Sequence, residues 1–171
     1  MKKFIYTIGL ASFLFLLGCS EAQESFTFEV KGKDFSIEQP TPGPNSAQVE
    51  ISFEDIKAAA EAKGLDASKI SAAKLEKAEV VAKDGQNLNG FESVLLQMTT
   101  ETGKMSEVAL LNPVPSGSSN ATLEIAKNET MATYFKGEKV TLILDLNSPA
   151  GDSLKHDMSL NATFQLSAAK K

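Results

Sequence analysis

Apolar side chains that recur at every second position are the feature of this chain that most restricts its fold. Val94, Leu96 and Met98 alternate with polar neighbours. Because successive side chains of a strand point to opposite faces, this period gives a strand one buried face and one exposed face. The same alternation, or a run of branched apolar residues, occupies segments 26–30, 35–37, 49–53, 75–82, 108–111, 122–125, 140–146 and 158–166. About eight short strands, spaced by roughly 10 to 20 residues, predict a mainly β fold with a β-sandwich architecture.

The first alternating segment leaves two arrangements open. Phe26, Phe28 and Val30 precede Gly32, and Phe35 and Ile37 follow it. Since glycine commonly occupies turns, the segment is either a hairpin or one bent strand. Residues 39–46 contain three prolines, which cannot donate to a strand ladder, and are predicted to form a loop.

One short helix is predicted near residues 53–63. Ser52, with Asp55 three residues later, resembles a capping-box start. Alanines 58–60 and 62 are strong helix formers, and Gly64 stands where a helix commonly ends. The small apolar face suits a helix that covers one end of a sheet.

The N-terminal segment has the pattern of a signal peptide. Lys2 and Lys3 precede an apolar stretch from Phe4 to Leu17, and polar residues follow directly after Cys19. A spanning helix needs about 20 apolar residues, so this stretch is too short to cross a bilayer. Cys19 is the only cysteine of the chain, which excludes a disulfide within it.

The run Leu16-Leu17-Gly18-Cys19 resembles the lipobox of bacterial lipoproteins. The resemblance implies that residues 1–18 are a cleaved signal peptide, that Cys19 is lipidated, and that residues 19–25 form a tether. Two or three acyl chains, palmitate among them, would hold such a protein on the membrane. Ser20 in place of aspartate after the cysteine implies the outer membrane, with the periplasmic and the surface-exposed face both open.

The mature region resembles small immunoglobulin-like β-sandwich lipoproteins of Bacteroidetes. The resemblance rests on the lipobox, the tether, the helical segment 51–64, the segment 91–96 that leads into a strand, and the strand segment 140–145. Cleavage after residue 18 would leave 153 residues (171 minus 18), which fits one domain, expected at 26–171. The resemblance implies an architecture and a location, but no activity.

The charge of the chain argues against nucleic-acid binding. The net charge is -5, and all 17 basic residues are lysine. Recognition of phosphate and guanine relies on the guanidinium fork of arginine, which this chain lacks. We therefore expect no nucleic-acid partner.

The chemistry-bearing residues are few. His156 is the only histidine, and neither a Gly-x-Ser-x-Gly elbow nor a His-Glu-x-x-His motif occurs. His156 is predicted to be a solvated loop residue without a catalytic or metal role, and the protein is predicted not to be an enzyme and to hold no cofactor. Asp145, Asn147 and Asp152 are candidate cation ligands, although turn formation explains the same residues. Ser153, in Asp152-Ser153-Leu154, resembles an O-glycosylation site of Bacteroidetes.

Two functions remain open at this level. The first is a non-enzymatic envelope module that binds an envelope protein or glycan or has a structural role. The second is a carrier of a small hydrophobic ligand in a cavity of the sandwich. An enclosed apolar pocket would favour the carrier, and a filled core would favour the module.

Overall fold

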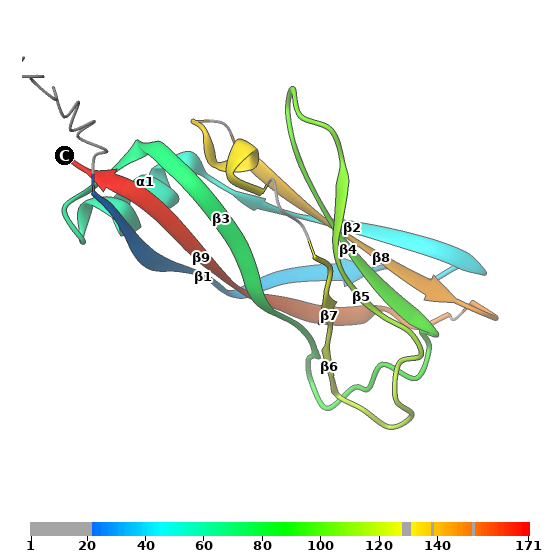
Figure 1. The fold of residues 1–171 in the computed structure, drawn as a ribbon. Helices are drawn as coiled ribbons and strands as arrows, with labels where there is room; N and C mark the ends of the chain where they lie inside the picture. Colours follow the sequence, from blue (N-terminus) through cyan, green and yellow to red (C-terminus); the bar gives the residue numbers. More distant parts are fainter. Residues whose placement is uncertain (1–21, 128–130, 138, 152) are drawn as a thin grey trace, which may run out of the picture.

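The computed structural model describes residues 22–127, 131–137, 139–151 and 153–171, and it confirms the predicted β-sandwich with one α-helix (Figure 1). One sheet has the order β1-β9-β3-β6 and the other the order β2-β8-β4-β5-β7, and all pairs are antiparallel. The strands of the first sheet are β1 (Gln23–Ile37), β9 (His156–Lys170), β3 (Leu65–Ala82) and β6 (Asn120–Thr122). Those of the second are β2 (Gly43–Ile51), β8 (Val140–Ser148), β4 (Ser93–Thr100), β5 (Ser106–Leu111) and β7 (Glu124–Ile125). The helices are α1 (Phe53–Glu61) and the short 3₁₀ helix η1 (Met131–Phe135).

The first four strands alternate between the two sheets. β1 and β3 lie in one sheet, β2 and β4 in the other, and β8 and β9 return to pair with β2 and β1. This is the double Greek-key order of a jelly roll. It differs from the ABED and CFG sheets of an immunoglobulin domain, although both are sandwiches.

The period of two in the sequence places the core between the sheets. Along β8 and most of β9, every second residue is buried. Phe135 of η1 and Phe164 of β9 are fully buried and meet edge to face, with ring centroids 5.3 Å apart. Leu96, Leu142 and Leu144 are also fully buried, and Leu96 pairs with Leu144 across β4 and β8. The middle of the sandwich is therefore packed with side chains.

The helix α1 begins where the sequence predicts and ends at Glu61, two residues before the predicted end at 63. The Ser52 hydroxyl accepts a hydrogen bond from the backbone N–H of Asp55 at 3.1 Å, which caps the first turn. Gly64 has a φ of 71°, a conformation that glycine adopts without strain. Ile56 and Ala60, both on α1, are its buried residues. Among the described residues, no helix is long and apolar enough to span a membrane.

The first segment is one bent strand, so the alternative of a hairpin is wrong. β1 pairs with β9 on both sides of a bulge between Val30 and Lys33. At the bulge, Gly32 has a φ of 56°, and its N–H donates to the side-chain oxygen of Asn161 at 2.8 Å. β1 begins at Gln23, so the last three residues of the expected tether 19–25 already pair with β9.

The proline-rich segment is shorter as a loop than predicted. Residues 43–46 belong to β2, and Pro44 pairs with Asn147. β2 is the edge strand of its sheet, so one side of its backbone faces no partner strand. Proline is tolerated on such a strand because its missing N–H need not break a ladder. The prediction of a loop over 39–46 is therefore wrong from Gly43 onward.

The strand register defines two ends of the sandwich. At the helical end, Gln23 pairs with Ala169, Leu65 pairs with Lys170, and α1 lies beside them (Figure 1). We call the opposite end the loop end. It carries the connecting segments 38–42, 83–92, 112–119 and 149–155. Residue 152 lies outside the described residues. The loop end lies roughly 50 Å from the helical end, since β9 has 15 residues that rise about 3.3 Å each.

Candidate functional site

The edge of β3 is only partly covered by a neighbouring strand. β9 pairs with β3 along its length, but on the other side β6 pairs only with Glu79, Val80 and Val81. The chain then leaves this sheet: Leu123 N–H still donates to Ala78 O at 3.0 Å, whereas Ala126 N–H donates to Val108 O at 2.9 Å in the other sheet. β7 and η1 also lie close to β3, but neither is paired with it.

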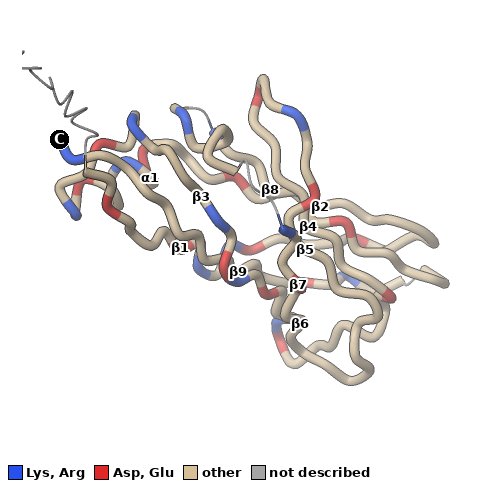
Figure 2. Tube along the Cα trace, viewed as in Figure 1, with Lys and Arg blue, Asp and Glu red and all other residues tan. Residues whose placement is uncertain are grey.

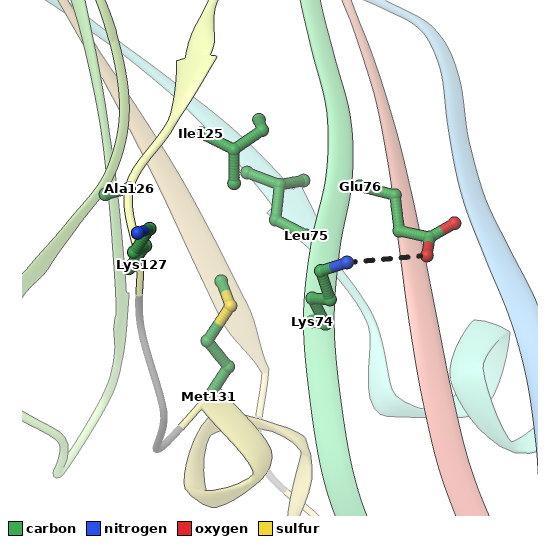
Figure 3. Close-up of a pocket in the computed structure, with 7 residues that line it drawn as sticks. All are labelled: Lys74, Leu75, Glu76, Ile125, Ala126, Lys127 and Met131. Carbon is green, nitrogen blue, oxygen red and sulfur yellow. Dashed lines mark ion pairs between the residues drawn. The ribbon is translucent and has the colours of Figure 1, made fainter.

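An open cleft of about 590 Å³ lies beside this part of β3. We call it the β3 cleft, and its lining is Lys74, Leu75, Glu76, Ile125, Ala126, Lys127 and Met131. Figure 3 shows the Leu75 side chain pointing toward Ile125, with Met131 beside them. Leu75 and Met131 are buried, 0% and 3% exposed, and only Ile125 of the three is half-buried, so the cleft exposes little of this apolar cluster.

Charged groups surround this apolar cluster. Lys74 and Glu76 lie on the outer face of β3, with Nζ and Oε1 4.0 Å apart, and both side chains are largely exposed (Figure 3). Lys127 is exposed on the opposite wall. Ion pairs between exposed groups contribute little free energy, so these side chains are free to meet a charged ligand. The three charges sum to one positive charge at the rim.

Charge elsewhere on the surface is mixed. Figure 2 shows lysine and acidic residues interspersed over both sheets. Within the described residues, no group of three histidine, cysteine, aspartate or glutamate side chains could hold a metal ion. The β3 cleft is thus distinguished by its shape and its strand edge rather than by a strong local field.

The candidate cation ligands are only partly brought together. Asp145 and Asn147 lie on the outer face of β8, two residues apart. Asp145 accepts a hydrogen bond from the Ser46 hydroxyl, and Asn147 donates to a carboxylate oxygen of Glu92 at 3.3 Å. Asp152 lies outside the described residues. Asp145 and Asn147 therefore take part in side-chain hydrogen bonds to neighbouring segments.

The two predicted modification sites differ in what the structure describes. Cys19 lies outside the described residues. Ser153 is exposed at the loop end and lines a shallow surface with Pro42 and Ala150. Its hydroxyl is accessible for the predicted glycosylation.

The prediction of a solvated His156 is wrong. The side chain is 7% exposed, and its ring meets that of Phe91 edge to face, with centroids 5.0 Å apart. His156 begins β9 opposite Ile37, so the last strand starts earlier than the sequence pattern indicates. The polar neighbours Lys155 and Asp157 favour a loop in the sequence, but a strand with one buried face also carries polar residues on its other face.

The segment after His156 carries a small polar network. Asp157 Oδ1 accepts a hydrogen bond from the Ser36 hydroxyl at 2.6 Å and lies 3.1 Å from Lys155 Nζ. The Ser36 hydroxyl first, and Lys155 second, lower the pKa of the Asp157 carboxyl. The same carboxylate raises the pKa of Lys155, together with Glu38. These contacts join β1, β9 and the preceding loop.

Sequence reasoning did not single out the β3 cleft. Leu75 and Ile125 were assigned to strands, and nothing in their alternation says whether a strand has a partner on both sides. The available signals were the brevity of the 122–125 segment and the lysines of β3, since natural edge strands are often short or lysine-rich.

Comparisons with known proteins give a likeness at low identity. No family model matches this chain, and no curated protein matches it. A solved structure of infectious bursal disease virus Gx strain has 13% identity and a TM-score of 0.44, covering 96% of this chain and 37% of that chain. The BFDV capsid protein has 10% identity and a TM-score of 0.42, with 87% and 93% of the two chains covered. Desmodium yellow mottle tymovirus has 11% identity and a TM-score of 0.36, with 99% and 97% covered. This chain thus spans about a third of the length of the infectious bursal disease virus chain, and these likenesses carry no functional argument.

Proposed function

We propose that this protein is a lipid-anchored lipoprotein of the cell envelope, located at the outer membrane, that acts as a non-enzymatic binding or structural module for an envelope protein or glycan. The observation that carries the proposal is the unique Cys19 at the end of Leu16-Leu17-Gly18-Cys19, four residues before β1 begins. So short a connection would keep the helical end close to the bilayer. The loop end, with Ser153, would then point away from it.

The packed interior supports the module over the carrier. Phe135, Phe164 and Leu142 fill the space between the sheets, where a carrier would hold its ligand. The β3 cleft is open rather than enclosed, and charged side chains border it. A small hydrophobic ligand would remain partly in contact with water there, whereas ligand pockets usually bury most of the ligand surface.

Metabolic labelling tests the anchor. Cells that express the full chain and receive an alkyne fatty acid should yield a tagged protein in the outer-membrane fraction. Cys19→Ser should be neither tagged nor retained, whereas Ser20→Ala, a matched neighbouring change, should behave as the wild type. Equal tagging of wild type and Cys19→Ser would refute lipidation at this residue. Protease treatment of intact cells then distinguishes the surface-exposed orientation, in which the chain is cut, from the periplasmic one.

A further inference from the structure

The strands of the second sheet carry negative charge only. All residues of β2, β8, β4, β5 and β7 are described, and they include four acidic residues and no lysine. The strands of the first sheet contain both kinds. The lysines that Figure 2 shows near the second sheet lie in its connections. The four acids occupy outward-facing positions, where Asp145 is half-buried and the others are exposed: Glu50, Glu107, Glu124 and Asp145.

One cross-strand row of this face combines apolar and acidic side chains. Leu95 of β4 lies opposite Leu110 of β5. The row continues to Asp145 of β8 on one side and to Glu124 of β7 on the other. Leu110 is 45% exposed and Leu95 is half-buried. Directly opposite residues have Cβ atoms about 5 Å apart, so the two leucines form an apolar pair between two carboxylates.

Ile143 extends this pair to a patch over three strands. It lies on the outer face of β8, opposite Gln97 and therefore diagonal to Leu95. Ile143 and Leu95 are half-buried, and neither belongs to the core between the sheets. We call Leu95, Leu110 and Ile143 the β4 patch. Among the described residues the two helices pack mainly against β1 and β3, so they leave this patch uncovered. Single exposed apolar side chains are ordinary on a protein surface, whereas adjacent ones favour contact with a partner.

We propose that the β4 patch and its flanking carboxylates bind a partner protein whose contact surface presents apolar side chains between lysine or arginine side chains. This inference rests on the proposed role as a binding module, and it selects a protein of stated chemistry over a glycan. The apolar groups of the partner cover Leu95 and Leu110, and its cations pair with Asp145 and Glu124. These two acids lie three strand spacings apart, about 14 Å at 4.8 Å each, so the cations of the partner are separated by a similar distance.

The carboxylates at the two ends of the row are available to a partner. Among the described residues neither Glu124 nor Asp145 forms an ion pair, and the Ser46 hydroxyl that donates to Asp145 is uncharged. Glu50, on the same face, is paired with Lys139, with Oε1 and Nζ 2.7 Å apart. The row therefore carries charge that a basic partner neutralises. Such complementarity sets the specificity and the association rate of a protein interface.

A second copy of this chain and a glycan fit the face less well. In a two-fold dimer the same acidic face would meet itself and place like charges together. A glycan would lay its hydroxyl groups over Leu95 and Leu110, which have no donor or acceptor for them. Those hydroxyls would lose their hydrogen bonds to water without replacement. A surface with both apolar and cationic side chains satisfies the whole row.

Selection of binders followed by NMR tests the surface. The mature chain from residue 19, with Cys19→Ser to remove the lipid, serves as the target. The probe is a displayed library of small helical proteins with one face randomised. Selected binders should be enriched in lysine or arginine around apolar residues, and they should shift the backbone amide signals of 93–97, 107–111 and 143–146. Binders that act on other surfaces only, or that lack basic residues, would overturn the proposal.

Charge reversal tests the carboxylates. Glu124→Lys and Asp145→Lys should each weaken the selected binder about fivefold. Glu29→Lys, the same change on the outer face of the first sheet, should leave binding within about twofold. Raising the salt concentration from 50 to 500 mM should weaken binding to the wild type and reduce these differences, because salt screens exposed charges. Equal effects of Glu124→Lys and Glu29→Lys would contradict the predicted cation contact.

Substitution of Leu110 tests the apolar part. Leu110→Asp should weaken the binder at least about tenfold, because it places a charge at the centre of the contact. Thr27→Asp on β1, which also adds one negative charge, should leave binding within about twofold. Leu110→Ala adds no charge and should still weaken the binder about threefold, so it replaces the aspartate variant if that variant unfolds. Unchanged binding to both Leu110 variants would refute the contact.

Photocrosslinking in cells identifies the natural occupant. A photoreactive amino acid in place of Leu110 in the full chain should form an adduct with another protein. The crosslinked peptide should contain lysine or arginine beside apolar residues, and Glu124→Lys should reduce the adduct while Glu29→Lys should not. An adduct with a second copy, an adduct with a glycan, or no adduct overturns the proposal. Failure of fatty-acid labelling would overturn the anchor and leave the binding results intact, so the two proposals fail separately.

Discussion

The loop end and the β3 cleft contrast in how completely each is closed. The loop end consists of long connections, which commonly carry binding surfaces, yet two of their large apolar side chains are packed: Leu88 is fully buried and Phe91 is 3% exposed, whereas Leu154 is 62% exposed. The β3 cleft lies along regular strands, yet it remains open. The contrast is therefore between connections with a packed interior and a cleft that opens beside a regular strand.

Hydrogen bonds between the connections explain why the loop end is closed. Leu88 N–H donates to Ser118 O at 2.8 Å, and Gln86 donates to Lys155 O at 3.0 Å. Gln86 also accepts a hydrogen bond from the N–H of Asp157 at 3.2 Å. Segments 83–92, 112–119 and 153–157 thus support one another. β6, by comparison, pairs with β3 over only three residues, and the next strand along the chain, β7, belongs to the other sheet.

Removal of a packed side chain at the loop end should have the largest effect on this contrast. Leu88→Ala should lower the free energy of unfolding by about 2–5 kcal/mol, because it leaves a cavity in a filled region. Ile125→Ala in the cleft should cost less than about 1.5 kcal/mol, since its side chain is half-buried. Urea unfolding of both variants measures the difference. Equal losses would show that the cleft is as tightly packed as the loop end.

Substitution of His156 should have an intermediate effect. His156→Ala removes the edge-to-face contact with Phe91 and should lower the free energy of unfolding by about 1–2 kcal/mol. The sequence alone predicts less than about 0.5 kcal/mol, the usual value for a solvated residue. Leu154→Ala, at an exposed side chain two residues earlier, serves as the control and should stay within about 0.5 kcal/mol. Indistinguishable results for the two variants would restore the loop interpretation.

Lowering the pH should slightly reduce the stability of the folded protein, because Asp157 at the loop end becomes protonated. Its pKa is lowered from the ordinary value of 3.8 by the Ser36 hydroxyl and Lys155, so the folded state favours the charged carboxylate. The stabilisation is present above about pH 4 and is lost as the pH falls through the lowered pKa. The thermal midpoint of the wild type should thus fall more steeply below pH 4 than that of Asp157→Asn. Ser36→Ala should flatten the profile partly, and identical profiles for all three proteins would count against this linkage.

Local patterns account for much of the fold. The alternation at Val94, Leu96 and Met98 predicts β4 because a strand has a period of two. Ser52 and Gly64 mark both ends of α1 because capping and a positive φ are local requirements. The first strand could not be decided in the same way, since Gly32 suits a turn and a bulge equally and only pairing with β9 selects the bulge.

The candidate site illustrates the opposite case. Burial of His156 depends on Phe91, which is 65 positions away in the chain and reaches it only through packing at the loop end. The β3 cleft depends on where β6 leaves one sheet for the other. The lysines of β3 are typical of an edge strand, but they do not say how much of that edge β6 covers.

The sequence by itself determined that this protein is built from strands with one capped helix, and it marks Cys19 as the candidate point of lipid attachment, because these properties follow from short-range period, capping and a contiguous motif. Only the tertiary structure decided which strands are neighbours, that the sheets pack as a filled jelly roll, and that β6 pairs with only three residues on one edge of β3. Strand pairing joins residues far apart in the chain, so the extent of this pairing is a property of the whole arrangement and of no single segment.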